Sequence, residues 1–279
     1  MASHRSRLLV SLIVVGLASA VFVAAQDQAG GDNGNSLTPI QQAEFLLKAK
    51  VTRSTHTKKG ITNPWWLTLT DGTITHLGNF QAIDEMKPQM QFADGHTEFN
   101  FKDSYHYNIA GYQLATLLGM DNMIPVTVER SWNGMKGSLS WGIPDVAMDE
   151  SDRMAKHVDA PDPDAWNKQM YKIRVFDELV YDTDPNLTNV LITKDWKIWR
   201  VDFSRGFRTW KKLKNPENLV MCDKNLFDKL KQLDENQLTE ATKKQISKSE
   251  IKAVMARRDL IVDAFNKLVA QKGEGAVLY

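Results

Sequence analysis

The sequence has 279 residues, with 35 basic and 34 acidic side chains, which give a formal net charge of +1. Hydrophobic residues make up 42% of the chain and charged residues 25%, close to the averages for soluble globular proteins. These values exclude a collagen, a coiled-coil rod, a disulfide-stapled miniprotein and a wholly disordered chain. The near-neutral charge also argues against a general nucleic-acid-binding protein, so we expect no nucleic-acid partner.

The N-terminal segment has the layout of a secretory signal. Two arginines and no acidic residue precede an uncharged stretch at 8–23, and small residues offer a cleavage point after Ala20 or Ala25. We expect residues 1–25 to be removed on export to the periplasm or the exterior, and the polar, glycine-rich residues 26–37 to be a flexible spacer. The alternative is an uncleaved signal that anchors the chain in the membrane, although 16 uncharged residues are short for a span.

The folded part is expected to begin with a helix and a set of antiparallel strands. Thr38 and Gln41 form a capping-box pattern around Pro39, which predicts a helix over 38–49. Alternating and β-branched residues, with an Asp-Gly hairpin signal, predict three antiparallel strands at 51–57, 65–70 and 73–80.

The middle of the chain adds a helix and two further strands. Residues 84–103 are polar and are interpreted as irregular, and a helix is predicted over 104–118. Two strands joined by an Asn-Gly turn are predicted at 125–132 and 136–141. Together with the preceding strands, these elements indicate a small β-rich lobe that ends near 142–147.

The second half of the sequence is mostly helical. A charged connection at 145–163 leads to a predicted helix at about 164–181, and helical sequence returns from about 222. Two short strands are expected at 190–193 and 197–201, and the last long helix at 248–272. This order predicts an α+β protein with a small β-rich lobe, a larger α-rich lobe and a cleft between them, where ligands commonly bind.

The segment from 175 to 208 carries the most specific chemical pattern. Asp184 lies five residues before Asn189, an apolar triplet follows, and Asp202 stands thirteen residues after Asn189 at the end of an apolar strand. In phosphoryl transfer, the first carboxylate can orient a hydroxyl group and accept its proton, while the amide and the second carboxylate hold Mg²⁺ against nucleotide phosphates. The hairpin between Asn189 and Asp202 would set their separation.

This segment resembles the catalytic and metal-binding segment of the protein-kinase-like superfamily, and of its atypical branches in particular. The run from Asp184 to Asn189 is similar to the loop of phosphoinositide 3-/4-kinases, HipA-type kinases and four-jointed-like kinases of the secretory pathway. Asp202-Phe203-Ser204 is similar to their metal-binding tripeptide. The chain as a whole resembles bacterial exported proteins of this superfamily.

The resemblance implies a bilobal kinase-like domain over 38–279. Its N-lobe, at about 38–143, would be small and rich in antiparallel strands, and its C-lobe, at about 144–279, would be larger and mostly α-helical. The implied activity is transfer of the γ-phosphate of ATP to a hydroxyl acceptor with Mg²⁺, with Asn189 and Asp202 as metal ligands and the first carboxylate of the pattern as the base. The acceptor is left open as a protein, a lipid or a small molecule.

Two positions depart from the pattern of that superfamily. A Lys on the third strand and a Glu on the following helix normally pair, but Gln81 and Asn108 stand where these residues are expected. Losing both leaves no buried charge without a partner, and two amides can still hydrogen-bond each other or a phosphate. A basic turn is the candidate phosphate-covering loop, with simple solvation as the alternative. It adds four cofactor-binding candidates to Gln81 and Asn108, namely Lys58, Lys59, Gly60 and Thr62.

Three hypotheses follow for the function. The first is an exported, active phosphotransferase that uses ATP and Mg²⁺. The second is a pseudokinase that keeps the fold and serves as a nucleotide-binding or scaffolding module. The third is an unrelated α+β surface protein in which the Asp/Asn spacing is coincidental. The presence of both carboxylates and the amide favours the first hypothesis.

Overall fold

The computed structural model describes residues 37–56, 64–92, 95, 97–184 and 186–279. The helices in these ranges are α2 (Pro39–Lys48), α3 (Tyr105–Leu117), α4 (Glu150–Ala155), α5 (Pro163–Val180), α6 (Lys224–Gln232), α7 (Glu235–Thr242) and α8 (Lys248–Lys272). The strands are β1 (Lys50–His56), β2 (Trp65–Thr70), β3 (Thr75–Gln81), β4 (Asp84–Gln91), β5 (Thr97–Ser104), β6 (Thr127–Trp132), β7 (Met135–Trp141), β8 (Val146–Asp149), β9 (Val190–Thr193) and β10 (Ile198–Arg200). Within these ranges, no helix has both the length and the apolar character of a membrane span.

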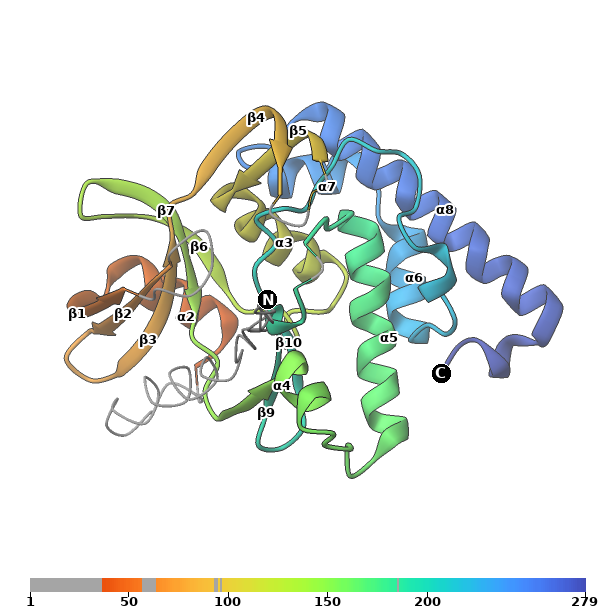
Figure 1. Cartoon of the computed structure of the whole chain (residues 1–279), viewed down its shortest axis with the longest axis horizontal. Coiled ribbons are helices and arrows are strands. Elements are labelled where there is room, and N and C mark those ends of the chain that lie inside the picture. The colour runs from red at the N-terminus through yellow and green to blue at the C-terminus, as the bar shows by residue number, and fades with distance from the viewer. Residues whose placement is uncertain (1–36, 57–63, 93–94, 96, 185) are drawn as a thin grey trace, which may run out of the picture.

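The chain forms a small β-rich lobe and a larger helical lobe (Figure 1). Among the described residues, the small lobe holds an antiparallel five-stranded sheet in the order β1-β2-β3-β7-β6, and α2 packs against β6 and β7. Helices α5 to α8 form most of the large lobe, where a three-stranded sheet in the order β10-β9-β8 lies beside α5. The predicted α+β architecture with two lobes is confirmed.

Alternation along β2 and β3 builds the core of the small lobe. Leu67, Leu69 and Phe80 are buried, whereas most of their neighbours along the two strands are partly exposed. Helix α2 closes one side of this core and begins with the predicted capping box, in which Thr38 and Gln41 satisfy each other's backbone N–H groups.

Helix α3 connects the cores of the two lobes. Leu114 is buried in the core of the large lobe, while Tyr112 packs against both cores. The helix approaches the segment after β10 so closely that a Cβ atom added to Gly111 would lie 2.7 Å from a ring carbon of Phe203. A glycine is therefore required at this position for α3 to pack against that segment.

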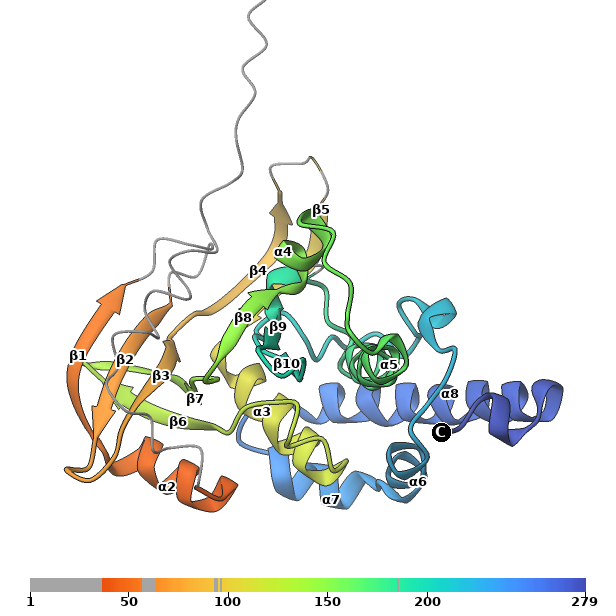
Figure 2. The same ribbon diagram turned by 90° about the horizontal axis from the view of Figure 1, so that it is seen from below.

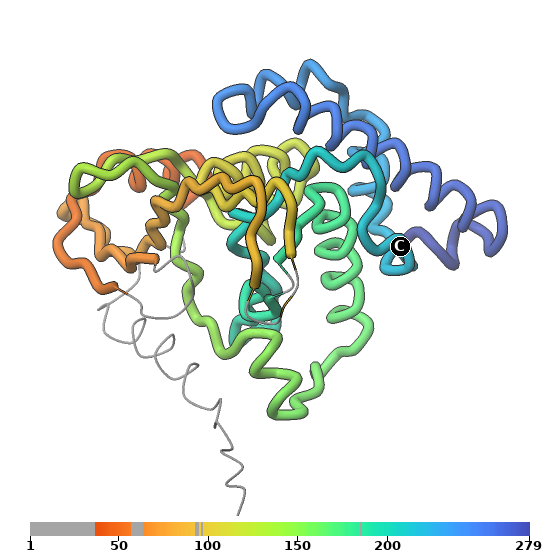
Figure 3. Tube along the Cα trace, turned by 45° about the horizontal axis from the view of Figure 1, so that its top comes forward, coloured from red at the N-terminus to blue at the C-terminus, as the bar shows by residue number. Residues whose placement is uncertain are grey.

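The interpretation of residues 84–103 as irregular is wrong. Strands β4 and β5 pair there as an antiparallel hairpin, with Asp84 opposite Ser104 at one end and Gln91 opposite Thr97 at the other. Figures 2 and 3 show this hairpin standing apart from the five-stranded sheet. Its strands escape a sequence-based prediction because they are mostly polar and because a proline lies inside β4.

The connection predicted at 145–163 also contains regular structure. Strand β8 pairs with β9, and α4 follows it directly. The side chain of Asp149 caps α4 by accepting a hydrogen bond from the backbone N of Asp152 at 2.8 Å. The last helix, in contrast, has the bounds that its sequence pattern predicts, and Gly273 follows its final residue.

Helix α8 crosses the large lobe and carries a fully buried arginine. Arg257 donates hydrogen bonds to the backbone carbonyl oxygens of Leu179 and Arg208, both at 2.8 Å, and to that of Trp210. This one side chain therefore ties α8 to the end of α5 and to the segment that follows Asp202.

Replacing Arg257 with Met should lower the free energy of unfolding by about 2–4 kcal/mol, because buried carbonyl oxygens then lose their donor. Urea unfolding followed by circular dichroism measures the change. Lys252→Met is the matched control, since Lys252 is exposed on the same helix and its replacement should shift stability by less than ~0.5 kcal/mol. Equal stability of the two variants would contradict the structural role of Arg257.

Candidate functional site

The candidate catalytic residues lie on the loops that flank β9 and β10. Helix α5 ends at Val180, and the left-handed backbone of the next residue, Tyr181 (φ 51°), turns the chain into the loop that carries Asp184. The short helical turn η2 (Leu187–Asn189) leads into β9, and Asp202 follows β10 after one residue. Because β9 and β10 are antiparallel, Asn189 and Asp202 lie at the same end of this sheet.

Asp184 and Asn189 are in direct contact. The Nδ2 of Asn189 donates to the Oδ2 of Asp184 at 3.3 Å, and the backbone N of Asn186 donates to the Oδ1 of Asp184 at 3.1 Å. This orientation of the amide leaves the Oδ1 of Asn189 as its atom for a cation. Asp184 is partly exposed and Asn189 is buried, so the carboxylate is accessible while its partner is fixed.

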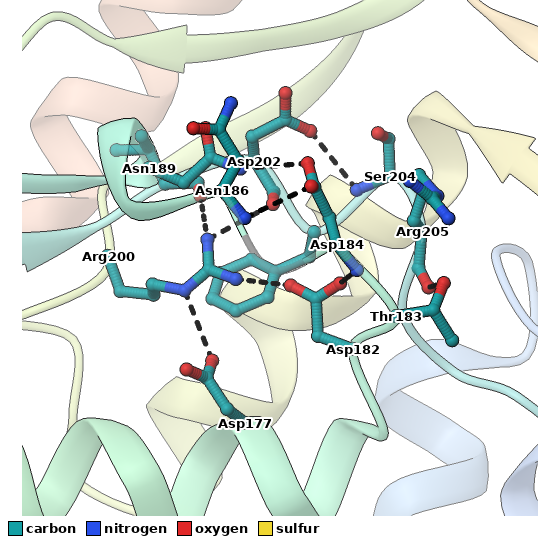
Figure 4. Close-up of polar contacts among 12 residues, drawn as sticks. Asp177, Asp182, Thr183, Asp184, Asn186, Asn189, Arg200, Asp202, Ser204 and Arg205 are labelled. Atoms are coloured by element: carbon teal, nitrogen blue, oxygen red, sulfur yellow. Dashed lines mark hydrogen bonds and ion pairs between the residues drawn. The ribbon is translucent and has the colours of Figure 1, made fainter. Parts of the chain in front are cut away.

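The Asp202 carboxylate is held at both oxygen atoms. Its Oδ1 accepts from the backbone N of Ser204 at 3.2 Å, and its Oδ2 accepts from the Nε2 of Gln81 at 3.1 Å. The backbone of Asp202 is left-handed (φ 60°), a conformation that costs a non-glycine residue roughly 1–2 kcal/mol. Arg200 stabilises it by donating to the carbonyl oxygen of Asp202 at 3.2 Å and to that of Val201. Figure 4 shows the contacts of Asp202 with Ser204 and Arg200 beside Asp184 and Asn189.

Arg200 holds the two loops of the site together. Its side chain is 3% exposed and forms ion pairs with Asp177 of α5, at 3.1 Å, and with Asp182 of the following loop. Asp182 also accepts a hydrogen bond from the backbone N of Asp184 at 2.9 Å. One buried cation thus orders the loop of Asp184 and the loop of Asp202, and breaking such a buried pair typically costs about 3–5 kcal/mol.

Gln81 and Asn108 form a hydrogen-bonded chain from the small lobe to Asp202. The Nδ2 of Asn108 donates to the Oε1 of Gln81 at 2.6 Å, and the Nε2 of Gln81 in turn donates to the Oδ2 of Asp202. The Oδ1 of Asn108 accepts from the backbone N of Phe203 at 2.6 Å. Both amides are 6% exposed. The two residues that the sequence places at the Lys and Glu positions therefore contact each other and fix the carboxylate.

The β4–β5 hairpin covers the segment after Asp202 and adds residues that the sequence analysis missed. The Oε2 of Glu98 pairs with Arg205 at 2.6 Å, and its Oε1 pairs with Arg208. The backbone N of Ser104 donates to the carbonyl oxygen of Ser204 at 2.8 Å. No local motif marks these contacts, because they join positions about 100 residues apart.

Asp103, at the end of β5, is a further buried carboxyl group beside the site. Burial raises its pKa to about 6; a hydrogen bond from the Ser204 hydroxyl opposes this rise, while the charges of Asp202 and Asp184 add to it. Asp103 is 6% exposed, and its Oδ1 has no hydrogen-bond partner among the described residues. No sequence signal marks Asp103, because it lies in the polar segment at 84–103 that was interpreted as irregular.

The candidate phosphate-covering turn falls outside the residues that the structure describes. Residues 57–63 include all four of its candidates, Lys58, Lys59, Gly60 and Thr62. Of the predicted cofactor-binding set, the structure therefore places Gln81, which contacts Asp202, and Asn108, which contacts Gln81.

The oxygen atoms of the site suit a hard divalent cation. Asp202 offers a carboxylate and Asn189 an amide oxygen, and the partnerless oxygen of Asp103 lies in the same buried neighbourhood. In the described part of the chain, no three His, Cys, Asp or Glu side chains form a cluster that holds a metal ion by itself. Mg²⁺ is usually bound by one or two carboxylates, with phosphates and water as the remaining ligands, so this ligand set fits it.

A cavity of about 680 Å³ lies beside the connection between the two lobes. Trp141, Ile143 and Trp199 line it together with residues of the β9–β10 turn. The three catalytic candidates are not among its lining residues, so this cavity is separate from the site built above.

Comparison with known proteins gives matches in structure only. No protein-family model and no curated protein matches the sequence. A structure of hydra Fam20 with sugar has a TM-score of 0.62 at 15% identity, over 85% of this chain and 90% of that chain. The Golgi casein kinase with Mn and ADP bound has a TM-score of 0.59 at 12% identity, over 86% and 78%. The Helicobacter pylori proinflammatory kinase CtkA has a TM-score of 0.50 at 9% identity, over 81% and 98%.

The chain has an atypical protein-kinase-like fold. The resemblance inferred from the short run around Asp184 and Asp202 is thereby confirmed for the fold. In this kinase-like fold, α3 carries Asn108 to the site, and the loops around β9 and β10 carry the three catalytic candidates.

Asp103 should make the stability of the metal-free protein depend on pH. A carboxyl group whose pKa rises on folding contributes stability that is fully present below its unfolded pKa and is lost as pH increases through its folded pKa. For Asp103 this window runs from about pH 4 to about pH 6. The difference between the unfolded and folded pKa values corresponds to at most ~3 kcal/mol in the free energy of unfolding.

Asp103→Asn should therefore be more stable than the wild type at pH 7.5 in the presence of a chelator, and this advantage should shrink towards pH 4. Urea unfolding at a series of pH values measures it. Glu85→Gln, which removes an exposed carboxylate opposite Asp103 on the hairpin, should show no such trend. A constant difference between Asp103→Asn and the wild type at every pH would contradict the prediction.

Proposed function

We propose that this chain is an atypical kinase-like phosphotransferase, which moves the γ-phosphate of ATP to a hydroxyl acceptor with Mg²⁺. The observation that carries the proposal is the grouping of Asp184, Asn189 and Asp202 at one end of the β9–β10 hairpin, where the small lobe contacts Asp202 through Gln81. One structural neighbour is described with Mn and ADP bound, which supports a nucleotide and a divalent cation as ligands here.

Asp184 is the proposed general base. Its two carboxylate oxygens are oriented by Asn186 and Asn189, and its partial exposure lets an acceptor hydroxyl reach it. A carboxylate in this position accepts the proton of the hydroxyl as its oxygen attacks the phosphate. The acceptor is a protein, a lipid or a small molecule that presents this hydroxyl group.

Asn189 and Asp202 are the proposed metal ligands. The Asn189 amide donates to Asp184, so its oxygen is the atom that would face the cation, and the Asp202 carboxylate is held beside it from two directions. A bound Mg²⁺ would neutralise the charge that develops on the transferred phosphate. The protein's own contribution is to keep the oxygen atoms in place before nucleotide binds.

The proposal includes export of the protein. The signal-like residues 1–25 support it, and one structural neighbour is described as a Golgi kinase. Membrane attachment would then come only through an uncleaved signal.

Mg²⁺ and ATP together should raise the melting temperature of the full chain by about 5–10 °C at ligand concentrations near 100 Kd, whereas ATP with a chelator should not. Asp202→Asn should lose the magnesium-dependent rise. Asp145→Asn is the control, because Asp145 is an exposed carboxylate remote from Asp202 that pairs with Lys194. An unchanged melting temperature in the wild type at millimolar ATP and Mg²⁺ would overturn the proposal.

The same proteins then separate an enzyme from a pseudokinase. Asp184→Asn should keep the magnesium-dependent thermal shift but lose 10²–10⁴-fold in the rate of ATP turnover, roughly the usual contribution of a general base. Equal turnover in Asp184→Asn and the wild type would exclude Asp184 as the base.

A nucleotide-binding pseudokinase is the second candidate, and the amide chain favours it. Gln81 and Asn108 supply no positive charge to a phosphate, and they already satisfy each other and Asp202 by hydrogen bonds. A Lys–Glu pair in these places would offer a cation to the nucleotide, which a neutral amide does not.

Substitution of both amides by the charged pair tests this difference. Asn108→Glu alone should destabilise the protein by about 3–5 kcal/mol, because it buries a carboxylate without a cation. Adding Gln81→Lys should recover most of that loss and tighten ATP binding about tenfold, a gain of ~1.4 kcal/mol. Urea unfolding and calorimetric ATP titration measure the two effects. Additive destabilisation in the double variant would show that these positions do not form a pair.

A further inference from the structure

We propose that Asp103 is an outer-sphere carboxylate of the cation site, which accepts hydrogen bonds from water molecules bound to the divalent cation at Asp202. This inference rests on the proposed function, because it presupposes that a cation binds Asp202. Asp103 would act as a positioning residue for the hydrated cation. It lies on β5 of the β4–β5 hairpin, which carries none of the predicted catalytic residues.

The first observation is a buried oxygen atom with nothing to bond. Asp103 is 6% exposed, and its Oδ1 has no hydrogen-bond partner in the described part of the chain. Buried carboxylate oxygens are normally paired, because removing such an atom from water without replacing its hydrogen bonds is costly. A ligand-bound water molecule is a donor that would satisfy it.

The second observation is the direction in which Asp103 faces. Phe101 lies two residues earlier on β5, on the same face of the strand, and its ring centre is 5.6 Å from the guanidinium carbon of Arg205. Asp103 therefore faces the segment after β10. Ser204 connects the two segments, because its backbone N donates to Asp202 at 3.2 Å and its carbonyl oxygen accepts from the backbone N of Ser104, the residue after Asp103, at 2.8 Å.

The third observation is the balance of charge around Asp103. Among the charges that act on Asp103, those of Asp202 and Asp184 are negative and that of Arg205 is positive. Arg205 is already paired with Glu98 at 2.6 Å, so its charge is shared with another carboxylate. The carboxylates of Asp103, Asp202 and Asp184 therefore outnumber the one arginine, which is already ion-paired with Glu98. A divalent cation would neutralise this local excess of negative charge.

The geometry favours an outer-sphere role over direct ligation. No three acidic, histidine or cysteine side chains in the described residues converge closely enough to hold a metal ion. Mg²⁺ keeps several of its water molecules when it binds proteins, and acceptors around those waters orient the ion and strengthen its binding. Asp103 has the burial and the unused acceptor that this role requires.

Manganese binding to the full chain tests the proposal, with free Mn²⁺ followed by electron paramagnetic resonance and no nucleotide present. Asp103→Asn should weaken Mn²⁺ binding about 10–100-fold, the usual effect of removing an outer-shell partner. Glu85→Gln, which removes the exposed carboxylate opposite Asp103 on the hairpin, should leave the affinity unchanged. Asp103→Ser serves as a second variant and should show the same loss as Asp103→Asn.

The outcomes separate this inference from the proposed function. Wild-type Mn²⁺ affinity in both Asp103 variants, with binding lost in Asp202→Asn, would overturn the role of Asp103 and leave the cation site intact. Unchanged affinity in Asp202→Asn would overturn the cation site itself. Melting temperatures in a chelator complete the test, since a purely structural role predicts that Asp103→Asn lowers the metal-free melting temperature while Mn²⁺ affinity stays the same.

Discussion

The candidate site depends on how the carboxylate of Asp202 is held. The residue has a left-handed backbone, which is unfavourable for a side chain with a Cβ atom, so its surroundings must maintain it. Arg200 donates a hydrogen bond to the backbone carbonyl oxygen of Asp202, and Gln81 of the small lobe donates one to its carboxylate. Because one partner comes from the sheet of the large lobe and the other from the small lobe, the position of Asp202 and the packing of the two lobes are set together.

The same contacts explain why most polar groups around Asp202 carry no free positive charge. Arg200 is neutralised by the carboxylates of Asp177 and Asp182, and the contact from the small lobe is a neutral amide chain. The site therefore gathers oxygen atoms and leaves part of their charge unbalanced. In this electrostatic setting a divalent cation would neutralise more of the negative charge than it does in a site that already contains a lysine.

Prediction from the sequence succeeded where the signals are local. The capping box at Thr38 and the bounds of the last helix were predicted because helix ends and apolar periodicity are encoded within a few residues. The β4–β5 hairpin was missed because its strands are mostly polar and a proline lies inside β4, and its contacts, such as Glu98 with Arg205, are with distant residues. Asp103 escaped prediction for the same reason, because it lies on β5 of this hairpin.

The sequence by itself determined the spacing of Asp184, Asn189 and Asp202, and with it the expectation of a kinase-like fold, because a loop followed by a hairpin is a local feature of the chain. Only the tertiary structure decided which residues support these three. Gln81 contacts Asp202, and Asn108 contacts Gln81 and Phe203, from a distant part of the sequence. Arg200 joins the loop of Asp184 to that of Asp202. Such contacts join segments far apart along the chain, so their partners are chosen by the packing of the lobes, which no short sequence pattern records.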